Sequence, residues 1–332
     1  MTALMPQFHI ARPRDVEAAV AARRKHPGSC FLAGGTDLVV NMRHGITRPT
    51  LLIDLAEIGE LAGIEATDAG VRIGASVTVA ALPRSPILAA RYRALVEAAE
   101  AIAGPGHRAM ATVGGNLCLD TRCTFYNQSE WWRHANNYCL KHGGEVCHVA
   151  PQGQRCHAAF TGDLAPALLA LGAEVEIAGA QQRRHIPLGE LYVEDGKAHL
   201  ALADDEIVVA VHLPPNPPPS AYAKLRVRGA IDYPLAGVAV ALATADGVVK
   251  ALRIGITGTN SRPFLLAGTD ELLGRPIDEK MLQQVDRSVQ KQVQPMRTTV
   301  ASAHYRRLAA AGLARRLVST LGAAPDEANL TA

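Results

Sequence analysis

The sequence predicts a mixed α and β fold in at least two lobes, and three observations lead to this prediction. The chain has 332 residues, whereas a compact domain commonly holds about 150. Hydrophobic residues make up 48% of the chain but aromatic residues only 4%, so its cores must be aliphatic, as in packed α/β layers. The run "PPNPPPS" at residues 214–220 is typical of a connector between lobes. This composition disfavours an all-β sandwich.

The first part of the chain predicts a small βαβ unit. Apolar residues after Asp15 recur at helical spacing up to a "PG" stop signal. The stretch "CFLAGGTDLVVNMRHG" (30–45) then combines a short strand, a Gly-Gly turn and a second helix. The strand "LLIDL" (51–55) completes the unit. We therefore expect a first subdomain at residues 1–57.

The middle of the chain continues this alternation and predicts a second subdomain at residues 58–215. A strand is expected at 70–76, and one long helix at 86–104, which begins with proline and ends with glycine. After an unusual cysteine-rich stretch, the pattern resumes with the helix "DLAPALLALG" and with strands at 174–179 and 206–213.

The last part of the chain, beyond the proline run, predicts a separate C-terminal domain at residues 216–325. The stretches "YAKLRVR" and "AGVAVALATADGVVKALRIGITG" indicate an antiparallel sheet, and the polar helices that follow are expected on one side of it. Residues 326–332 are expected to form a tail.

Charge and terminal sequence exclude two classes of partner. The net charge is +3, with acidic and basic residues well mixed, so neither nucleic acid nor an anionic membrane surface is indicated. No basic N-terminal segment precedes an apolar run, and no stretch of 18 apolar residues occurs. We expect a cytoplasmic protein, in which clustered cysteines are better explained as metal ligands or redox groups than as disulfides.

Two Gly-Gly turns lie where a strand meets a helix. In "AGGTD" (33–37) and "TVGGN" (112–116), the absence of β-carbons lets backbone N–H groups approach an anion. A single Gly-Gly pair is most simply a tight turn, but two such turns, each with a threonine, could hold both phosphates of a dinucleotide. Neither matches G-x-G-x-x-G, so a Rossmann NAD site is not supported.

The segment between these turns and the next helix contains four of the six cysteines and both tryptophans. The four are separated by 15, 7 and 8 residues: Cys123, Cys139, Cys147 and Cys156. No C-x-x-C pair occurs among them, and structural zinc sites usually use such pairs, so the spacing favours an iron-sulfur cubane.

Alternatives to that assignment stay open at the level of spacing. Four interleaved histidines could complete a mixed zinc site: His134, His142, His148 and His157. The cysteines could also be merely buried. Cys118, five residues before Cys123, could also be a ligand, so spacing leaves the choice of four from five open, although its place beside the second Gly-Gly turn suggests packing. Cys30 is most simply a core residue.

The quoted motifs carry a resemblance over nearly the whole chain. "FLAGGTDLV", "TVGGN", "TGDLAPALLALGAEVEI" and "YAKLRVRGAIDYPLAGVAVAL" resemble, in this order, the FAD-binding medium subunit of the molybdenum hydroxylases, which include xanthine dehydrogenase and aerobic CO dehydrogenase. The resemblance implies an α+β protein: an FAD-binding region (1–215) of two α/β subdomains of the PCMH type, and a C-terminal α+β domain like that of CO dehydrogenase flavoproteins.

By the same resemblance, FAD contacts fall on both Gly-Gly motifs and on isolated positions beyond them. The implied set is Leu32, Ala33, Gly34, Gly35, Thr36, Asp37, Ile102, Thr112, Val113, Gly114, Gly115, Asn116, Asp163, Val208 and Lys224. Taken singly, Asp163 would be a helix cap, Lys224 a solvent-facing strand residue, and Ile102 and Val208 ordinary core.

The cysteine-rich stretch is an insertion, at residues 122–157, that ordinary members of this family lack. It resembles the insertion in the β subunits of 4-hydroxybenzoyl-CoA reductases, which holds a 4Fe-4S cluster. The resemblance thus implies that the four cysteines are iron ligands and that no catalytic residue lies on this chain.

The implied enzyme reductively removes the hydroxyl of 4-hydroxybenzoyl-CoA, with a ferredoxin-type electron donor. The implied partners are a large subunit with a molybdopterin cofactor and a small subunit with a pair of 2Fe-2S clusters, in a dimer of heterotrimers. Two alternatives remain: an oxidative molybdenum hydroxylase subunit, or a zinc-stabilised binding module that docks through Trp131, Trp132 and Tyr138.

Overall fold

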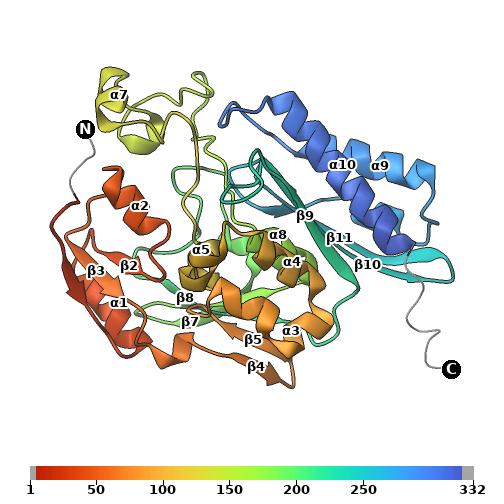
Figure 1. The fold of residues 1–332 in the computed structure, drawn as a ribbon, viewed down its shortest axis with the longest axis horizontal. Helices are drawn as coiled ribbons and strands as arrows, with labels where there is room; N and C mark the ends of the chain where they lie inside the picture. The colour runs from red at the N-terminus through yellow and green to blue at the C-terminus, as the bar shows by residue number, and fades with distance from the viewer. Residues whose placement is uncertain (1–4, 324–332) are drawn as a thin grey trace.

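The computed structural model describes residues 5–323, so the expected tail at 326–332 lies outside the described residues. Three sheets organise this part of the chain (Figure 1). The first is parallel, in the order β1-β3-β2, and consists of β1 (His9–Ala11), β2 (Cys30–Leu32) and β3 (Leu51–Asp54). With α1 (Val16–Lys25) and α2 (Leu38–Arg43) it contains the expected βαβ unit.

Helix α1 forms because apolar side chains recur on one face. Asp15 caps the helix by accepting a hydrogen bond from the Ala18 N–H at 2.7 Å. The buried residues Val16 and Val20 then pack against Ile53 of β3 and against the next sheet. The first sheet is thereby held to the middle of the molecule by an aliphatic core.

The second sheet is antiparallel, with five strands in the order β4-β5-β8-β6-β7. Its strands are β4 (Ile64–Thr67), β5 (Gly70–Gly74), β6 (Glu174–Ala178), β7 (Arg183–Pro187) and β8 (Ile207–Leu213). Short helices connect them: α3 (Pro86–Arg91), α4 (Arg93–Ala101), α5 (Pro105–Met110), α6 (Val113–Leu117) and α8 (Leu164–Leu171).

The prediction of one continuous helix at 86–104 is wrong, because the helix is interrupted at Tyr92. Tyr92 adopts φ −118° and ψ 52°, which is not helical, and separates α3 from α4. Its side chain is fully buried, and its hydroxyl donates to the carbonyl of Pro214 at 2.6 Å. A long-range contact with the proline-rich connector therefore overrides local helix propensity.

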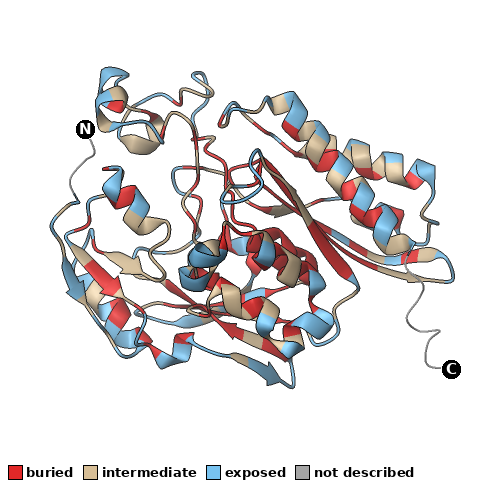
Figure 2. Ribbon diagram, in the orientation of Figure 1, coloured by how far each residue is buried: buried red, intermediate tan, exposed pale blue. Residues whose placement is uncertain are grey.

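The third sheet, β12-β11-β10-β9, is antiparallel and lies between two layers of helices. Its strands are β9 (Ser220–Leu225), β10 (Ala236–Ala245), β11 (Val248–Thr257) and β12 (Phe264–Leu265). Helices α9 (Glu279–Gln292) and α10 (Ala303–Gly322) cover one face with their buried sides (Figure 2).

The other face of the third sheet packs on the middle of the molecule. Ala239 and Ala241 of β10 share one core with α4 and α8. The expectation that helices cover only one side of this sheet is therefore wrong. The α+β fold class itself is confirmed.

A buried arginine of α10 holds the segment at residues 296–298, which in turn contacts the start of the insertion. The side chain of Arg306 is fully buried and donates to the carbonyls of Leu235 and Met296 and to the Thr298 hydroxyl. The Thr298 carbonyl in turn accepts from the Thr124 N–H at 2.9 Å. The C-terminal domain therefore helps to place the start of the cysteine-rich stretch.

Within residues 5–323, no helix is both long and apolar enough to cross a bilayer.

Candidate functional site

Two cavities open at the Gly-Gly turns. The Asp163 cavity, of about 410 Å³, is lined by both turns and by Ile102, Asp163 and the loop 228–233. The Tyr126 cavity, of about 530 Å³, is lined by strand residues of the first two sheets, among them Val208, and by residues outside the strands, among them Cys118 and Tyr126. The cavities share Phe31, Ala33, Asp37, Leu38, Gly115 and Cys118 as wall residues. Together they offer an extended, bent site that crosses both turns.

Close backbone packing explains why glycine stands in the first turn. A β-carbon on Gly34 would lie 1.7 Å from the carbonyl oxygen of Met110, which belongs to the segment that leads into the second turn. The two turns therefore lie against each other. In the second turn, Thr112 caps α6, its hydroxyl accepting from the Gly115 N–H at 3.1 Å.

Most of the predicted FAD contacts line these cavities. Ten of them line the Asp163 cavity: Ala33, Gly34, Gly35, Thr36, Asp37, Ile102, Thr112, Gly115, Asn116 and Asp163. Gly114 and Val208 line only the Tyr126 cavity. Ile102 and Val208 thus lie at different ends of the composite site. Three predicted residues do not line either cavity: Leu32, Val113 and Lys224.

Lys224 does not line the Asp163 cavity itself but pairs with Asp163, which does. Its ammonium lies 3.0 Å from a carboxylate oxygen of Asp163, and the Tyr222 hydroxyl donates to the same carboxylate at 2.6 Å. Both side chains of the ion pair are buried, with 3% and 6% of their surface exposed. Burial raises the pKa of Asp163, and the neighbouring Lys224 opposes that rise. Lys224 is therefore not the solvent-facing strand residue that its sequence position allows.

We expect Asp163→Asn to destabilise the protein by about 3–5 kcal/mol, because it leaves the Lys224 ammonium buried without a counter-charge. Asparagine preserves the side-chain volume, so packing is not the cause. Urea unfolding with FAD in excess measures the change. The double variant Asp163→Asn/Lys224→Met should recover part of the loss, and an unchanged stability of the single variant would contradict this role.

A loop that sequence patterns did not single out closes the Asp163 cavity. Arg228, Ile231, Asp232 and Tyr233 all line it. Ile231 has φ 52°, an uncommon conformation for a β-branched residue, and its N–H donates to the carbonyl of Ala103, itself at φ 40°. Residues 228–233 lie inside the motif "YAKLRVRGAIDYPLAGVAVAL", but local sequence does not indicate that they line a cavity. Their position depends on the contact of Ile231 with Ala103, which is distant in sequence.

The four cysteines of the insertion come together in the structure. All are buried, and they line one small cysteine cavity with Tyr126, Lys141, His148 and other residues: Cys123, Cys139, Cys147 and Cys156. Among the four histidines of the segment, only His148 lines this cavity, and its Nε2 contacts the carbonyl of Tyr138 at 2.7 Å. The arrangement therefore favours an all-cysteine ligand set over a mixed one.

The surroundings of the sulfurs act on their pKa values in opposite directions. Burial raises the pKa of Cys123, and donation to Cys147 together with burial raises that of Cys156. The Ala158 N–H donates to the Cys156 sulfur at 3.4 Å, and backbone N–H groups near Cys123 and Cys147 act to lower the pKa values of those thiols. A hydrogen bond from Cys156 lowers the pKa of Cys147 to about 5. Lys141, with only 5% of its side chain exposed, lines the same cavity, and its ammonium pairs with Asp120 at 2.6 Å. Such donors stabilise and tune thiolate-ligated clusters.

The four sulfurs do not form the compact group that surrounds a bound zinc ion. Four thiolates around a single zinc, each about 2.3 Å from it, lie about 3.8 Å from one another. Among residues 5–323, no three of the cysteine sulfurs lie within 4.8 Å of one another. Cys147 and Cys156, by contrast, are close enough to share a hydrogen bond.

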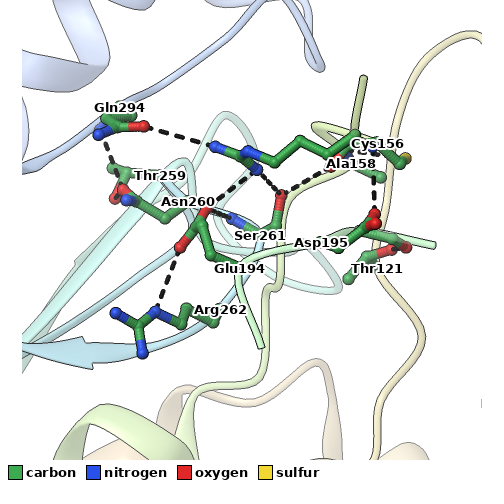
Figure 3. A network of polar contacts seen from close by, with 12 residues as sticks. Thr121, Cys156, Ala158, Glu194, Asp195, Thr259, Asn260, Ser261, Arg262 and Gln294 are labelled. Carbon is green, nitrogen blue, oxygen red and sulfur yellow. Dashed lines mark hydrogen bonds and ion pairs between the residues drawn. The ribbon is translucent and has the colours of Figure 1, made fainter. Parts of the chain in front are cut away.

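The end of the insertion is held by both neighbouring domains (Figure 3). The Cys156 N–H donates to Asp195 at 3.1 Å, and the Ser261 hydroxyl donates to the Cys156 carbonyl at 3.2 Å. Glu194 accepts from the Ser261 N–H and pairs with Arg262 at 3.4 Å. The last cysteine thus sits on a fixed network rather than on a free loop.

The start of the insertion is anchored to the first Gly-Gly turn. Arg122 forms an ion pair with Asp37 and donates to the Asn41 side chain at 2.9 Å. Asp37, predicted as a FAD contact, therefore also joins the turn to the insertion.

Tyr126 separates the cysteine cavity from the Tyr126 cavity, since it lines both. The side chain is 7% exposed, and its ring lies 4.8 Å from the Lys141 ammonium. Sequence patterns did not indicate this residue, because its position depends on how the insertion folds back. The cysteine cavity and the Tyr126 cavity thus share Tyr126 as a wall residue.

The two remaining cysteines lie away from the cysteine cavity. Cys118 and Cys30 line the Tyr126 cavity instead. Burial raises the pKa of Cys118 to about 12, so its thiol stays protonated. In this geometry Cys118 does not compete with Cys123 as a ligand.

Two family descriptions together match almost the whole chain. Residues 6–216 match the "FAD binding domain in molybdopterin dehydrogenase", and residues 220–321 match the "CO dehydrogenase flavoprotein C-terminal domain".

Individual relatives agree with these families. The aldehyde oxidoreductase FAD-binding subunit of Escherichia coli K12 is 36% identical over 270 residues, covering 78% of this chain and 83% of that one. The carbon monoxide dehydrogenase medium chain of Afipia carboxidovorans is 28% identical, covering 94% and 95%. The structure of reconstituted CO dehydrogenase from Oligotropha carboxidovorans matches with a TM-score of 0.79 and 26% identity, covering 97% and 99%.

Proposed function

Because the chain belongs to the family of FAD-binding medium subunits of the xanthine dehydrogenase and CO dehydrogenase type, we propose that it holds FAD and a 4Fe-4S cluster as an electron-transfer subunit. The observation that carries this proposal is the packing of four buried cysteines against the site of the Gly-Gly turns, with Tyr126 between them. When bound, the flavin supplies exchange between one-electron and two-electron chemistry, and the cluster supplies one-electron transfer.

In this proposal the two turns hold the FAD pyrophosphate. Backbone N–H groups of residues 33–37 and 112–116 would donate to it, and the absent β-carbons allow the close approach. Ile102 and Val208 would contact opposite ends of the cofactor, in agreement with their positions in the two cavities. The Asp163–Lys224 pair and Tyr222 would fix one wall of the site.

The cluster would be held by Cys123, Cys139, Cys147 and Cys156. Support comes from their burial in one cavity, from the Ala158 N–H that donates to Cys156, and from Lys141, which lines the same cavity and whose ammonium pairs with Asp120. The absence of a C-x-x-C pair among the four cysteines speaks against a structural zinc ion. Family membership likewise favours an electron-transfer subunit over a zinc-stabilised binding module.

The direction of electron flow distinguishes two versions of this function. Relatives named as CO dehydrogenase and aldehyde oxidoreductase subunits favour an oxidative enzyme, which passes electrons from substrate to FAD. The cysteine insertion favours the reductive version, since an additional cluster gives low-potential electrons a point of entry. There a pair of electrons and a pair of protons would convert 4-hydroxybenzoyl-CoA to benzoyl-CoA and water on a molybdenum-containing large subunit, with a ferredoxin-type donor.

The assembled complex tests these two versions. It would consist of this chain, the molybdenum-cofactor subunit and a small subunit with 2Fe-2S clusters, expected as a dimer of heterotrimers. With reduced ferredoxin, we expect benzoyl-CoA to form from 4-hydroxybenzoyl-CoA. Oxidation of an aldehyde or of CO by an artificial acceptor, without any benzoyl-CoA formation, would instead establish the oxidative version.

A further inference from the structure

Away from both cavities, three side chains form a cluster on the second sheet. Glu176 lies on β6, His185 on β7 and His212 on β8. Glu176 stands directly opposite His185 in the β6–β7 register, and His212 stands opposite Glu174, two residues away on β6. Because alternate residues of a strand share one face, all three side chains point to the same side of the sheet.

We propose that Glu176, His185 and His212 form a binding site for a divalent transition-metal ion, with zinc as the best-suited ion. One ligand atom from each side chain can be chosen so that all three lie within 4.8 Å of one another. The Nε2 of His212 lies 3.4 Å from a carboxylate oxygen of Glu176, and the two imidazole rings are 4.8 Å apart between centroids.

These distances are close to those of a bound site. Ligands about 2.0–2.1 Å from zinc in a tetrahedral arrangement lie about 3.4 Å apart. The Glu176–His212 pair already has this separation, so only small rotations of the exposed His185 side chain are needed. Three ligands on adjacent hydrogen-bonded strands are also better fixed than ligands on loops.

The donor set selects the class of ion. Two imidazoles and one carboxylate are ligands of zinc and of other late first-row ions, whereas magnesium and calcium prefer oxygen ligands alone. Three protein ligands leave a position for water, and the exposure of His185 leaves solvent access to it.

Two arginines next to Glu176 are compatible with this role. Arg183 lies 3.4 Å from one carboxylate oxygen, but it also pairs with Glu17 and Glu60. Arg72 lies 3.8 Å from the other oxygen and donates instead to the Glu60 carbonyl at 3.0 Å. Since both guanidiniums have other acceptors, the oxygen that faces His212 can bind an ion, while Arg183 orients the carboxylate as outer partners of metal ligands commonly do.

The position of the cluster near α1 indicates that a bound ion would stabilise the fold. Arg183 connects the cluster to Glu17 of α1 and Glu60, which lie on the first-subdomain side of the second sheet. An ion bound here would join the edge strand β7 to β6 and β8, so it should stabilise the sheet where the first subdomain meets it.

Equilibrium dialysis of the purified, cofactor-loaded protein against zinc chloride tests the proposal. Wild type should bind one zinc per chain more than His185→Ala/His212→Ala and should gain thermal stability with zinc, whereas the double variant should not. His26→Ala, an exposed histidine at the end of α1, is the matched control and should behave as wild type.

A second variant protects the test against misfolding. Glu176→Gln keeps the side-chain volume and should also lose the additional zinc. Equal zinc binding and equal stabilisation in wild type and in the folded variants would overturn the proposal. Both measurements are independent of electron transfer, so their outcome does not depend on the proposed function.

Discussion

Replacing Cys139 by serine should reduce the iron content of the anaerobically purified protein from about four atoms per chain to nearly none. The Cys139 side chain is buried in the cysteine cavity with the other three ligands, so a cluster has no substitute thiolate there. Metal analysis by mass spectrometry, together with the visible absorption of the cluster, measures this loss.

Cys118→Ser is the control for this experiment. Cys118 lies outside the cysteine cavity, so the variant should keep its iron. If Cys118→Ser lost iron while Cys139→Ser retained it, the ligand assignment would be wrong.

Gly34→Ala should lower the affinity for FAD by about tenfold or more. The added β-carbon would lie 1.7 Å from the Met110 carbonyl oxygen, so one Gly-Gly turn must move away from the other. Overpacking of this kind costs about 1–3 kcal/mol, and 1.4 kcal/mol corresponds to a factor of ten. Titration of the FAD-free protein with FAD, followed by flavin fluorescence, measures the change.

Gly106→Ala is the matched control for Gly34→Ala. Gly106 lies in α5, on the same segment as Met110, and a β-carbon there would meet no atom within 4 Å. This variant should bind FAD as wild type does. Equal affinity of Gly34→Ala and wild type would show that the packing of the two turns does not shape the FAD site.

Local patterns were sufficient to predict the fold class and the small βαβ unit. Helix α1 and strand β8 carry apolar residues at the spacing of their own secondary structure, so their burial follows from the sequence. The break at Tyr92 could not be predicted in this way, because it depends on a hydrogen bond to Pro214 across the molecule. The packing of α4 and α8 on the third sheet could not be predicted either, because it joins segments that are far apart in the sequence.

In the candidate site, too, some features could be predicted from local sequence and others depend on the fold. The two Gly-Gly turns and the four cysteines were recognisable, because each depends on residue type and spacing. Tyr126 and Ile231 were not, since they reach their cavities only through the folding of the insertion and of a strained loop. The Glu176, His185 and His212 cluster depends on strand register, which the sequence does not display.

The content of iron, zinc and flavin in the anaerobically purified wild-type protein tests the central claim most directly. The claim is that one chain holds a 4Fe-4S cluster on its insertion beside an FAD site. It predicts about four irons and about one FAD per chain, with iron lost on Cys139→Ser. Zinc in the cysteine cavity in place of iron, retained in His185→Ala/His212→Ala and lost in Cys139→Ser, would contradict it.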